Sequence, residues 1–238
     1  MNWKKTLFSI GIIVIILVGG LTMFNVANQK VVNQDYSLSK FTKVDIDIPT
    51  GDVVLKAGNK YHVSYSGLEK NVPKVEIKDS KLKISFKNQI THIRLFNFKQ
   101  LNSKIVIEMP KEQLESLNVD NSNGNFSADY LAVKIGDIDL SNGNIDIKDL
   151  KTKDGISFDT SRGNIRIERS NATGYDLDTS LGKITISGKK YGDSFEKNSD
   201  SRNVLEADTS LGSISVNYNI KKRISYLLIK STANSFLF

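Results

Sequence analysis

Five aspartates recur at nearly regular spacing in the second half of the sequence, and they are the side chains best suited to chemistry. They are Asp120, Asp139, Asp159, Asp178 and Asp208. If the segments that carry them stack, neighbouring carboxylates stand about 5 Å apart in one column. Carboxylates at that distance can bind Ca²⁺, or act as the acid and the nucleophile of a polysaccharide hydrolase. The metal-ligand candidates are Asp139, Asp159, Asp178 and Asp208.

The same aspartates also suit a structural role at a repeated corner. There each Asp would accept hydrogen bonds from backbone N–H groups and from the Ser two positions on. A catalytic pair needs two carboxyls in different environments so that only one keeps its proton, whereas a repeated column offers nearly equal environments. We therefore expect a structural column without catalytic residues, bound metal or cofactor. A cell-wall polysaccharide hydrolase or lyase using the column is the alternative.

No other familiar catalytic pattern is present in the sequence. His62 and His92 lie thirty residues apart, and there is neither a Gly-x-Ser-x-Gly elbow nor a phosphate-binding loop. The chain has no Cys, which excludes disulfides, thiolate catalysis, Cys-based zinc sites and a lipoprotein anchor. These features favour a protein that is not an enzyme.

The elements that carry the aspartates are repeats of about twenty residues. Each reads apolar-Asp-x-Ser-x-Gly-x-apolar, and the glycines are Gly124, Gly143, Gly163, Gly182 and Gly212. Apolar residues alternate on both sides of each Gly, which is typical of strands with one buried face. An antiparallel sandwich would explain the alternation but not five near-identical units. We predict an all-β fold, a β-solenoid in which successive units stack as rungs and each Gly forms a structural corner.

The repeats divide the chain into regions. Residues 36–218 form one extracytoplasmic solenoid, irregular over 36–118 and regular over 119–218. The segment Ile48–Val53, with Gly51 at its centre, is a candidate further rung. The tail, 219–238, departs from the repeat. It either caps the last rung or binds a membrane or partner through Lys221–Arg223 and the apolar residues beside them.

The N-terminus predicts a membrane anchor. Residues 7–24 contain no charge, and a helix of that length spans roughly 27 Å, close to the thickness of a bilayer core. Lys4 and Lys5 precede it, which favours a cytoplasmic N-terminus and an extracellular C-terminal domain. A cleaved signal peptide is the alternative, but Asn25–Asn28 is a poor cleavage site. We expect residues 1–24 to be a cytoplasmic stub and single-pass signal-anchor in the cell membrane, and 25–35 to be a tether.

The net charge of +7 is unevenly placed. Residues 118–218 carry 12 basic and 16 acidic residues, whereas residues 30–117 carry 15 basic and 10 acidic ones. An acidic repeat body above a basic, membrane-proximal part does not suit nucleic-acid binding but suits an anionic membrane surface. The lipid bilayer is therefore an expected partner, and nucleic acid is not.

Two further segments are candidates for partner binding. The spacing of 30 between Gly182 and Gly212 implies an insertion that would project from one edge, with Tyr191 and Phe195 able to meet a partner. Residues 91–100 carry Phe96 and Phe98 beside basic residues. The alternatives are a polar loop for the insertion and a buried cap for residues 91–100.

The segments Ile105–Pro110 and Leu114–Val119, followed by the serial Ser-x-Gly-x-Ile units, resemble the bacterial putative-adhesin β-strand-repeat family, a domain of unknown function. The resemblance covers roughly residues 40–218. Similar domains occur in Lia-type envelope-stress proteins of low-GC Gram-positive bacteria, so the resemblance implies a surface role, including responses to membrane-active antibiotics. It supplies no catalytic residues.

Our leading hypothesis is a membrane-anchored, non-enzymatic protein of the bacterial envelope, acting in envelope stress or in surface binding and adhesion. It would bind an envelope protein, a cell-wall polymer or a membrane-active peptide. Besides the hydrolase or lyase, a second alternative is an accessory subunit of a membrane sensor complex. The oligomeric state stays open.

Overall fold

The computed structural model describes residues 30–86 and 103–218. Several features of the sequence analysis lie outside these residues: the predicted span at 7–24, His92, Phe96, Phe98 and the tail from 219. Within them, no helix has the length and hydropathy needed to cross a membrane. The described chain is built from strands, with a single 3₁₀ turn, Glu69–Asn71. The all-β prediction is confirmed.

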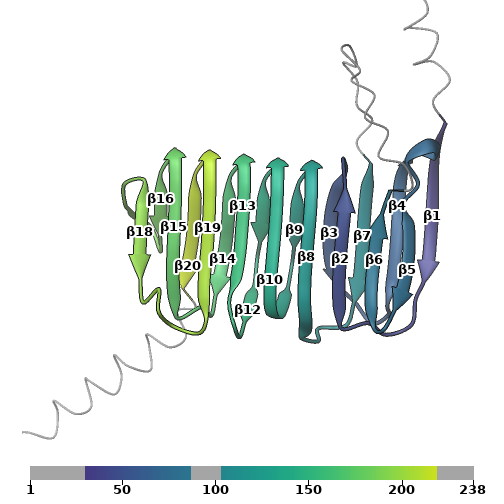
Figure 1. Cartoon of the computed structure of the whole chain (residues 1–238), viewed down its shortest axis with the longest axis horizontal. Coiled ribbons are helices and arrows are strands. Elements are labelled where there is room, and N and C mark those ends of the chain that lie inside the picture. The colour runs from purple at the N-terminus through teal and green to yellow at the C-terminus, as the bar shows by residue number, and fades with distance from the viewer. Residues whose placement is uncertain (1–29, 87–102, 219–238) are drawn as a thin grey trace, which may run out of the picture.

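Two faces of strands pack against each other along one long stack (Figure 1). In spatial order, face A consists of β5 (Lys74–Lys78), β6 (Lys81–Ser85), β2 (Lys43–Ile48), β8 (Leu114–Asn123), β10 (Leu131–Asn142), β13 (Ile156–Arg162), β19 (Val204–Leu211), β15 (Gly174–Leu181) and β18 (Ser194–Lys197).

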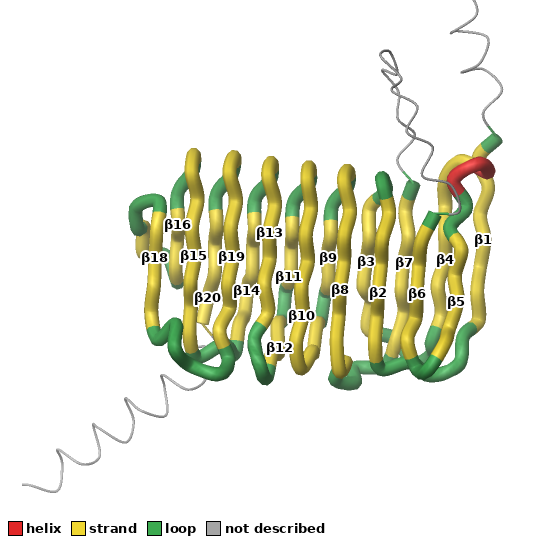
Figure 2. The backbone as a smooth tube through the Cα atoms, in the orientation of Figure 1, coloured by secondary structure: helices red, strands yellow, loops and turns green. Residues whose placement is uncertain are grey.

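Face B lies behind it. In the same direction it consists of β1 (Val31–Ser37), β4 (His62–Leu68), β7 (Lys104–Met109), β3 (Asp52–Ala57), β9 (Phe126–Ala128), β11 (Ile145–Ile147), β14 (Ile165–Ser170), β20 (Ile214–Tyr218), β16 (Ile184–Ile186) and β17 (Lys189–Lys190). A short third side contains β12 (Leu150–Thr152), which pairs with the start of β10. Figure 2 shows the loops that join the two faces along the top and bottom of the stack.

Alternation of residue types builds the core between the faces. In β13, Ile156, Phe158 and Thr160 point inward and are buried, whereas Ser157 and Asp159 point outward. The same position recurs in each rung of face A, so that side chains from consecutive rungs stack in buried columns. The column that contains Phe158 is Ile84, Ile46, Val119, Ile138, Phe158, Ala207 and Leu177.

The rungs do not follow the order of the chain at either end. The rung β19–β20 lies between β13–β14 and β15–β16, although it comes last in the sequence. At the opposite end, the first rung, β2–β3, lies between β6–β7 and β8–β9. The expectation that successive units stack is therefore correct for the middle of the stack and wrong at its two ends.

Strands predicted as tether or as a projecting insertion cover the ends. Residues 31–35 belong to β1, which pairs antiparallel with β4, so the tether ends earlier than expected. The insertion between Gly182 and Gly212 contains β17 and β18, which pair antiparallel with β16 and β15. The insertion thus covers the edge of the stack instead of projecting from it, because open strand edges would otherwise pair with other chains.

Candidate functional site: an acidic face and its groove

Six carboxylates stand in register on the outer surface of face A. The strand pairing aligns Asp47, Asp120, Asp139, Asp159, Asp208 and Asp178, in that spatial order. Asp47 joins the five aspartates found in the sequence. Asp178 neighbours Asp208 and not Asp159, because the β19 rung lies between them.

The column lies within the strands and not at a corner, which corrects the expected placement. Each repeat Asp lies four residues before its corner Gly, on the exposed side of the strand. The side-chain partner of Asp159 also differs from the expectation: Ser157 Oγ, two positions earlier, donates to Asp159 Oδ2 at 3.1 Å. The period of two places every Asp between inward residues, so it must face solvent.

A second acidic column runs beside the first, two residues earlier in each strand. It contains Asp45, Asp137, Glu206 and Asp176, with Asn118 and Ser157 in the other rungs. Like charges directly opposite each other on neighbouring strands repel. From β2 to β15, the exposed surface of face A is therefore a concentrated region of negative charge, whereas Lys83 of β6 stands opposite Asp45.

The titration of these groups reflects both burial and repulsion. Partial burial raises the pKa of Asp159, and the neighbouring carboxylates of Asp208, Asp139 and Asp137 raise it further. Burial likewise raises the pKa of Asp120, with Asp47 and Asp139 adding to the shift. The two pKa shifts have the same direction and the same leading cause, which is unlike the divided roles of an acid and a nucleophile.

A groove of about 610 Å³ lies beside the acidic columns, at the start of the face A strands. Residues from β8, β10, β13 and β19 line it, together with the segment before β19. Ile135 is an exposed apolar side chain on its wall, with 55% of its surface accessible. Asp137 and Glu206 of the second acidic column line it too. The groove therefore combines apolar surface with negative charge.

An ion pair stands at one side of this groove. Arg202 Nε donates to Asp154 Oδ1 at 2.6 Å, and the Lys134 ammonium lies 3.8 Å from Asp154 Oδ2. The hydrogen bond from Arg202 holds the pKa of Asp154 below its usual range. Because the Arg202 side chain is largely exposed, it can move without disturbing the core.

The glycines do form the corners. Gly124, Gly143 and Gly163 have positive φ values of 146°, 155° and 159°. A Cβ on Gly212 would overlap the carbonyl oxygen of Gly163, and one on Gly182 would overlap that of Gly212. Close stacking of one rung on the next therefore requires glycine even where φ does not.

Polar side chains tie the corners together. Thr160, Thr209 and Thr179 each donate from Oγ1 to the glycine carbonyl of the neighbouring rung, at 3.0, 2.9 and 2.8 Å. A second ladder follows the residue after each Gly, in which the backbone N–H of Asn144 donates to Asn125 Oδ1 at 2.9 Å. The repeated polar residues around the glycines are thus structural.

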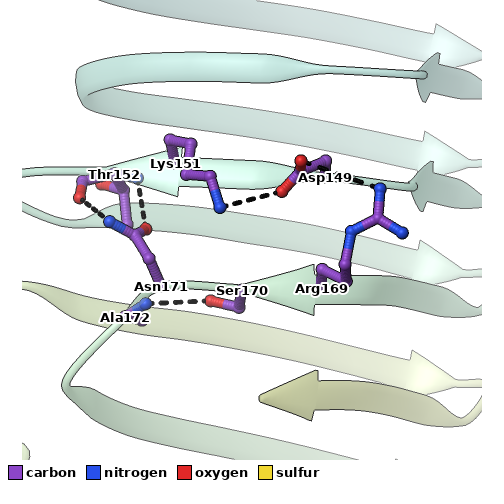
Figure 3. A network of polar contacts seen from close by, with 7 residues as sticks. All are labelled: Asp149, Lys151, Thr152, Arg169, Ser170, Asn171 and Ala172. Carbon is purple, nitrogen blue, oxygen red and sulfur yellow. Dashed lines mark hydrogen bonds and ion pairs between the residues drawn. The ribbon is translucent and has the colours of Figure 1, made fainter. Parts of the chain in front are cut away.

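The short third side carries its own polar network (Figure 3). Asp149 forms ion pairs with Lys151 at 3.1 Å and with Arg169 at 3.7 Å. The backbone N–H of Thr152 donates to Asn171 Oδ1 at 2.7 Å, and Asn171 Nδ2 donates to the Thr152 carbonyl at 3.0 Å. These contacts join two rungs across a corner, so this network also stabilises the stack.

The aromatic residues of the insertion pack at the end of the stack. The rings of Tyr191 and Phe195 meet edge to face with centroids 4.5 Å apart, and both are partly buried against the core. Lys189 lies over the Tyr191 ring at 5.1 Å. Contact of this pair with a partner stays a prediction.

Over residues 30–86 and 103–218, no group of three or more His, Cys, Asp or Glu side chains is arranged to hold a metal ion. His62 lies 3.2 Å from Asp35 Oδ1, between β4 and β1 and away from the acidic columns. On face A, Lys81 Nζ lies 3.7 Å from Asp45 Oδ2, so a basic side chain adjoins the carboxylates at the β6 end.

Several residues of this site were missed from the sequence. Asp47 had a signal, because it lies four residues before Gly51 as the others do before their glycines. Ile135 and Arg202 had none, since each belongs to the groove only through the stacking of β10 and β19.

Several solved structures of low sequence identity are similar to this chain. A putative cell adhesion protein from Clostridium sporogenes shares 15% identity, with 80% of this chain and all of that chain covered at a TM-score of 0.47. A putative adhesin from Bacteroides fragilis shares 16% identity over 79% of this chain and 97% of that one, with a TM-score of 0.38. A putative adhesin from Parabacteroides distasonis shares 14% identity over 80% and 98%, with a TM-score of 0.37.

Among curated proteins, none matches the sequence. The profile of one family, Toastrack DUF4097, matches residues 41–232. This match covers most of the chain and confirms the adhesin-like family to which the repeats pointed. The chain belongs to the Toastrack DUF4097 family.

Proposed function

We propose that this chain is a non-enzymatic binding protein of the bacterial envelope, and that face A binds a basic partner. The observation that carries the proposal is the register of six carboxylates on an exposed face, with a second acidic column and a groove beside it. A basic surface or peptide would complement both the charge of the columns and the apolar wall at Ile135.

The rigidity of the stack supports binding. Each strand of the column is paired on both sides, so the ladder holds the backbone that carries the carboxylates in place. Flat, preorganised surfaces bind with little loss of conformational entropy. Such a surface suits envelope stress sensing and surface adhesion alike, and the identity of the basic partner decides between them.

Membrane anchoring through residues 7–24 is part of the proposal. The exposed side of β5 and β6, at the end of the stack that also contains β1, carries Lys74, Lys78, Lys81 and Lys83, with Glu76 ion-paired to Lys74 at 2.5 Å. Lysines at this end would face anionic lipid headgroups, each contributing about 1 kcal/mol near such a surface. The acidic rungs would then point away from the membrane.

A charge-neutralised variant tests the binding surface. The full chain in lipid nanodiscs is titrated with fluorescent oligolysine, and Asp139→Asn/Asp159→Asn/Asp208→Asn is compared with the unaltered chain. We expect about a tenfold or greater loss of affinity, because opposite charges on the two surfaces are the main attraction. The affinity of the unaltered chain should also fall steeply with salt.

The matched control neutralises three carboxylates of face B, as Glu108→Gln/Asp146→Asn/Glu168→Gln. Equal losses in both variants would show attraction to net charge alone and would contradict a role for face A. Turnover of cell-wall glycans by the full chain, abolished by the face A substitutions, would replace the binding proposal with the hydrolase.

A further inference from the structure

The groove beside the acidic columns has two neighbouring rows of residues on its floor. The row at the start of the strands is small or apolar and consists of Ser116, Ile135, Gly155 and Val204. The row two residues further along each strand consists of Asn118, Asp137, Ser157 and Glu206. An apolar row thus lies directly beside a row that carries negative charge.

Ile135 is the apolar centre of the first row. It stands opposite Ser116 in the strand pairing, and the next residue, Gly136, donates from its backbone N–H to the Gly155 carbonyl at 3.3 Å. Ser116 and Gly155 are too small to cover the Ile135 side chain, which stays exposed. An exposed apolar side chain between small neighbours leaves room for an apolar side chain of a partner to be buried against it.

Ser157 is the small residue at the centre of the second row. Asp137 and Glu206 flank it on the neighbouring strands, so the two acidic residues are two strand spacings apart, about 9.6 Å. A cation above Ser157 would therefore lie about 5 Å from each of them. Within residues 30–86 and 103–218, neither Asp137 nor Glu206 takes part in an ion pair. Both carboxylates are thus free to bond to a cation of a partner.

One guanidinium already lies at the side of this groove. Arg202 donates from Nε to Asp154 at 2.6 Å, and the Lys134 ammonium lies near the other carboxylate oxygen of Asp154. The cations of the chain itself therefore compensate Asp154, whereas Asp137 and Glu206 have no such partner. The groove accommodates an arginine side chain beside its apolar row and leaves two further carboxylates for a second one.

We propose that the groove binds an extended segment of a basic partner in which an apolar side chain and an arginine are two residues apart. The apolar side chain would pack on Ile135, and the guanidinium would lie above Ser157, between Asp137 and Glu206. These two positions are about 8 Å apart, and alternate side chains of an extended segment lie about 6.6 Å apart on one side. The inference rests on the proposed function and adds which part of a basic partner face A recognises.

Charge and donor geometry favour such a peptide over other occupants. Asp137 and Glu206 would repel an anionic lipid headgroup. A planar guanidinium has five N–H donors, so it can bond to both carboxylates and to the Ser157 hydroxyl oxygen, whereas an ammonium presents its donors from a single point. The groove volume of about 610 Å³ also suits a segment of several residues and not a lone side chain.

Two peptides measure the apolar contact in the full chain in lipid nanodiscs. One contains three copies of Leu-Ser-Arg-Ser, and the other contains three copies of Ser-Ser-Arg-Ser, so their charges are equal. By fluorescence anisotropy we expect the unaltered chain to bind the leucine peptide about tenfold more tightly, because only its apolar side chains cover Ile135. Ile135→Ser should remove this preference and change the affinity for oligolysine by less than about twofold.

Leu211→Ser is the matched control for the apolar contact. Leu211 is also an exposed apolar residue of face A, with 44% of its surface accessible, but it ends β19 at the side away from the groove. This variant should keep the preference for the leucine peptide. A preference that persists in Ile135→Ser, or that is lost equally in both variants, would overturn the proposal.

Ser157→Lys tests the position of the guanidinium. The new ammonium would lie between Asp137 and Glu206 and compete with the arginine of the peptide, so the affinity for both peptides should fall at least tenfold. Ser122→Lys adds the same charge to the exposed side of β8 outside the groove, and a loss of about threefold or less is expected. Equal losses in the two lysine variants would contradict the placement above Ser157.

A pair of neutralised variants gives the same information without adding a larger side chain. Asp137→Asn/Glu206→Gln removes the two carboxylates that flank Ser157, whereas Asp45→Asn/Asp176→Asn removes two from the same column outside the groove. The first variant should lose about tenfold in affinity for the arginine peptides and the second clearly less. Equal losses would again overturn the proposal.

Oligolysine separates this inference from the proposed function. If oligolysine binding depends on Asp139, Asp159 and Asp208 while every groove variant behaves like its control, the groove inference is wrong and face A remains the binding surface. If neither oligolysine nor the arginine peptides bind, the proposed function fails and the groove inference fails with it. A loss confined to the groove variants and to the arginine peptides is the result that we expect.

Discussion

Both ends of the stack have an outermost rung whose strand edges must be covered, and different strands cover them. At each end the first or the last described rung lies one place inside, and antiparallel strands cover the outermost rung. At the N-terminal end the cover is β1, β4 and β5, of 7, 7 and 5 residues. At the C-terminal end it is β17 and β18, of 2 and 4 residues.

The difference lies in the strands that neighbour the inner rung in the chain. β2–β3 is preceded by β1 and followed by β4, and these two strands pair with each other across seven residue pairs. β19–β20 is preceded by β17 and β18, which pair with two different strands, β16 and β15. Rung-to-rung contacts are much the same throughout a repeat fold, so the covering strands distinguish the two ends.

The largest predicted contrast is between the corner glycines of the two inner rungs. Gly212→Ala should destabilise the fold by about 3 kcal/mol or more, because the new Cβ would overlap the backbone carbonyl of Gly163. Gly51→Ala meets Ser103 atoms at 3.1 Å and retains a φ of +135°, so its cost should be nearer to about 1–2 kcal/mol. Urea denaturation of both variants measures the difference.

Gly188→Ala is the control for the glycine comparison, since a Cβ there meets nothing within 4 Å, although its φ is +82°. Its loss should reflect backbone strain alone. A Gly212→Ala variant no less stable than Gly188→Ala would show that the corners do not depend on close stacking.

A smaller contrast is expected in the buried column that both inner rungs share. Ala207→Leu at the C-terminal end should cost about 1–3 kcal/mol, because Phe158 and Leu177 already fill the space on either side. At the N-terminal end, Ile46→Leu keeps the volume between Ile84 and Val119 and should cost less than about 1.5 kcal/mol. Thermal unfolding of both variants tests the comparison, and equal losses would contradict this size argument.

The smallest predicted contrast is in how the stability of two variants depends on pH. The pKa of Asp159 is raised in the folded state, so its ionisation destabilises the fold above that pKa. Stability is regained as pH falls through the raised pKa towards the unfolded value near 4. Asp159→Asn should therefore stabilise the protein by about 0.5 kcal/mol at pH 7 and lose this advantage in acid.

Glu112 pairs with Lys40 at the N-terminal end of the stack. Its contribution to the stability of the fold should depend on pH in the opposite direction. The hydrogen bond from Lys40 lowers the pKa of Glu112, so its contribution is present above the unfolded pKa and is lost as pH falls through the folded one. Glu112→Gln should not stabilise the protein at pH 7. Urea midpoints measured between pH 3 and pH 7 compare the two variants, and a shared direction of change would refute the assignment.

Local patterns were enough to predict the repeat strands, the corners and the extra rung around Gly51, but not β1, β17 and β18. Each of these depends on residues close in the chain: alternation buries one face, and Gly permits the corner. Placement of the aspartates at the corner was an error that the same pattern could have prevented, because Asp159 stands between the inward residues Phe158 and Thr160. The groove could not be predicted, since Ile135 and Arg202 meet it from distant parts of the chain.

The sequence by itself determined an all-β stack of rungs with glycine corners and a repeated acidic side, because the period of two and the closeness of one rung to the next are set by residue type. Only the tertiary structure decided the order of the rungs. Near-identical units offer each other nearly identical interfaces, so the local pattern does not distinguish Asp178 from Asp208 as the neighbour of Asp159. That choice follows from the fit of Ala207 beside Phe158 and from the strands that must cover each end.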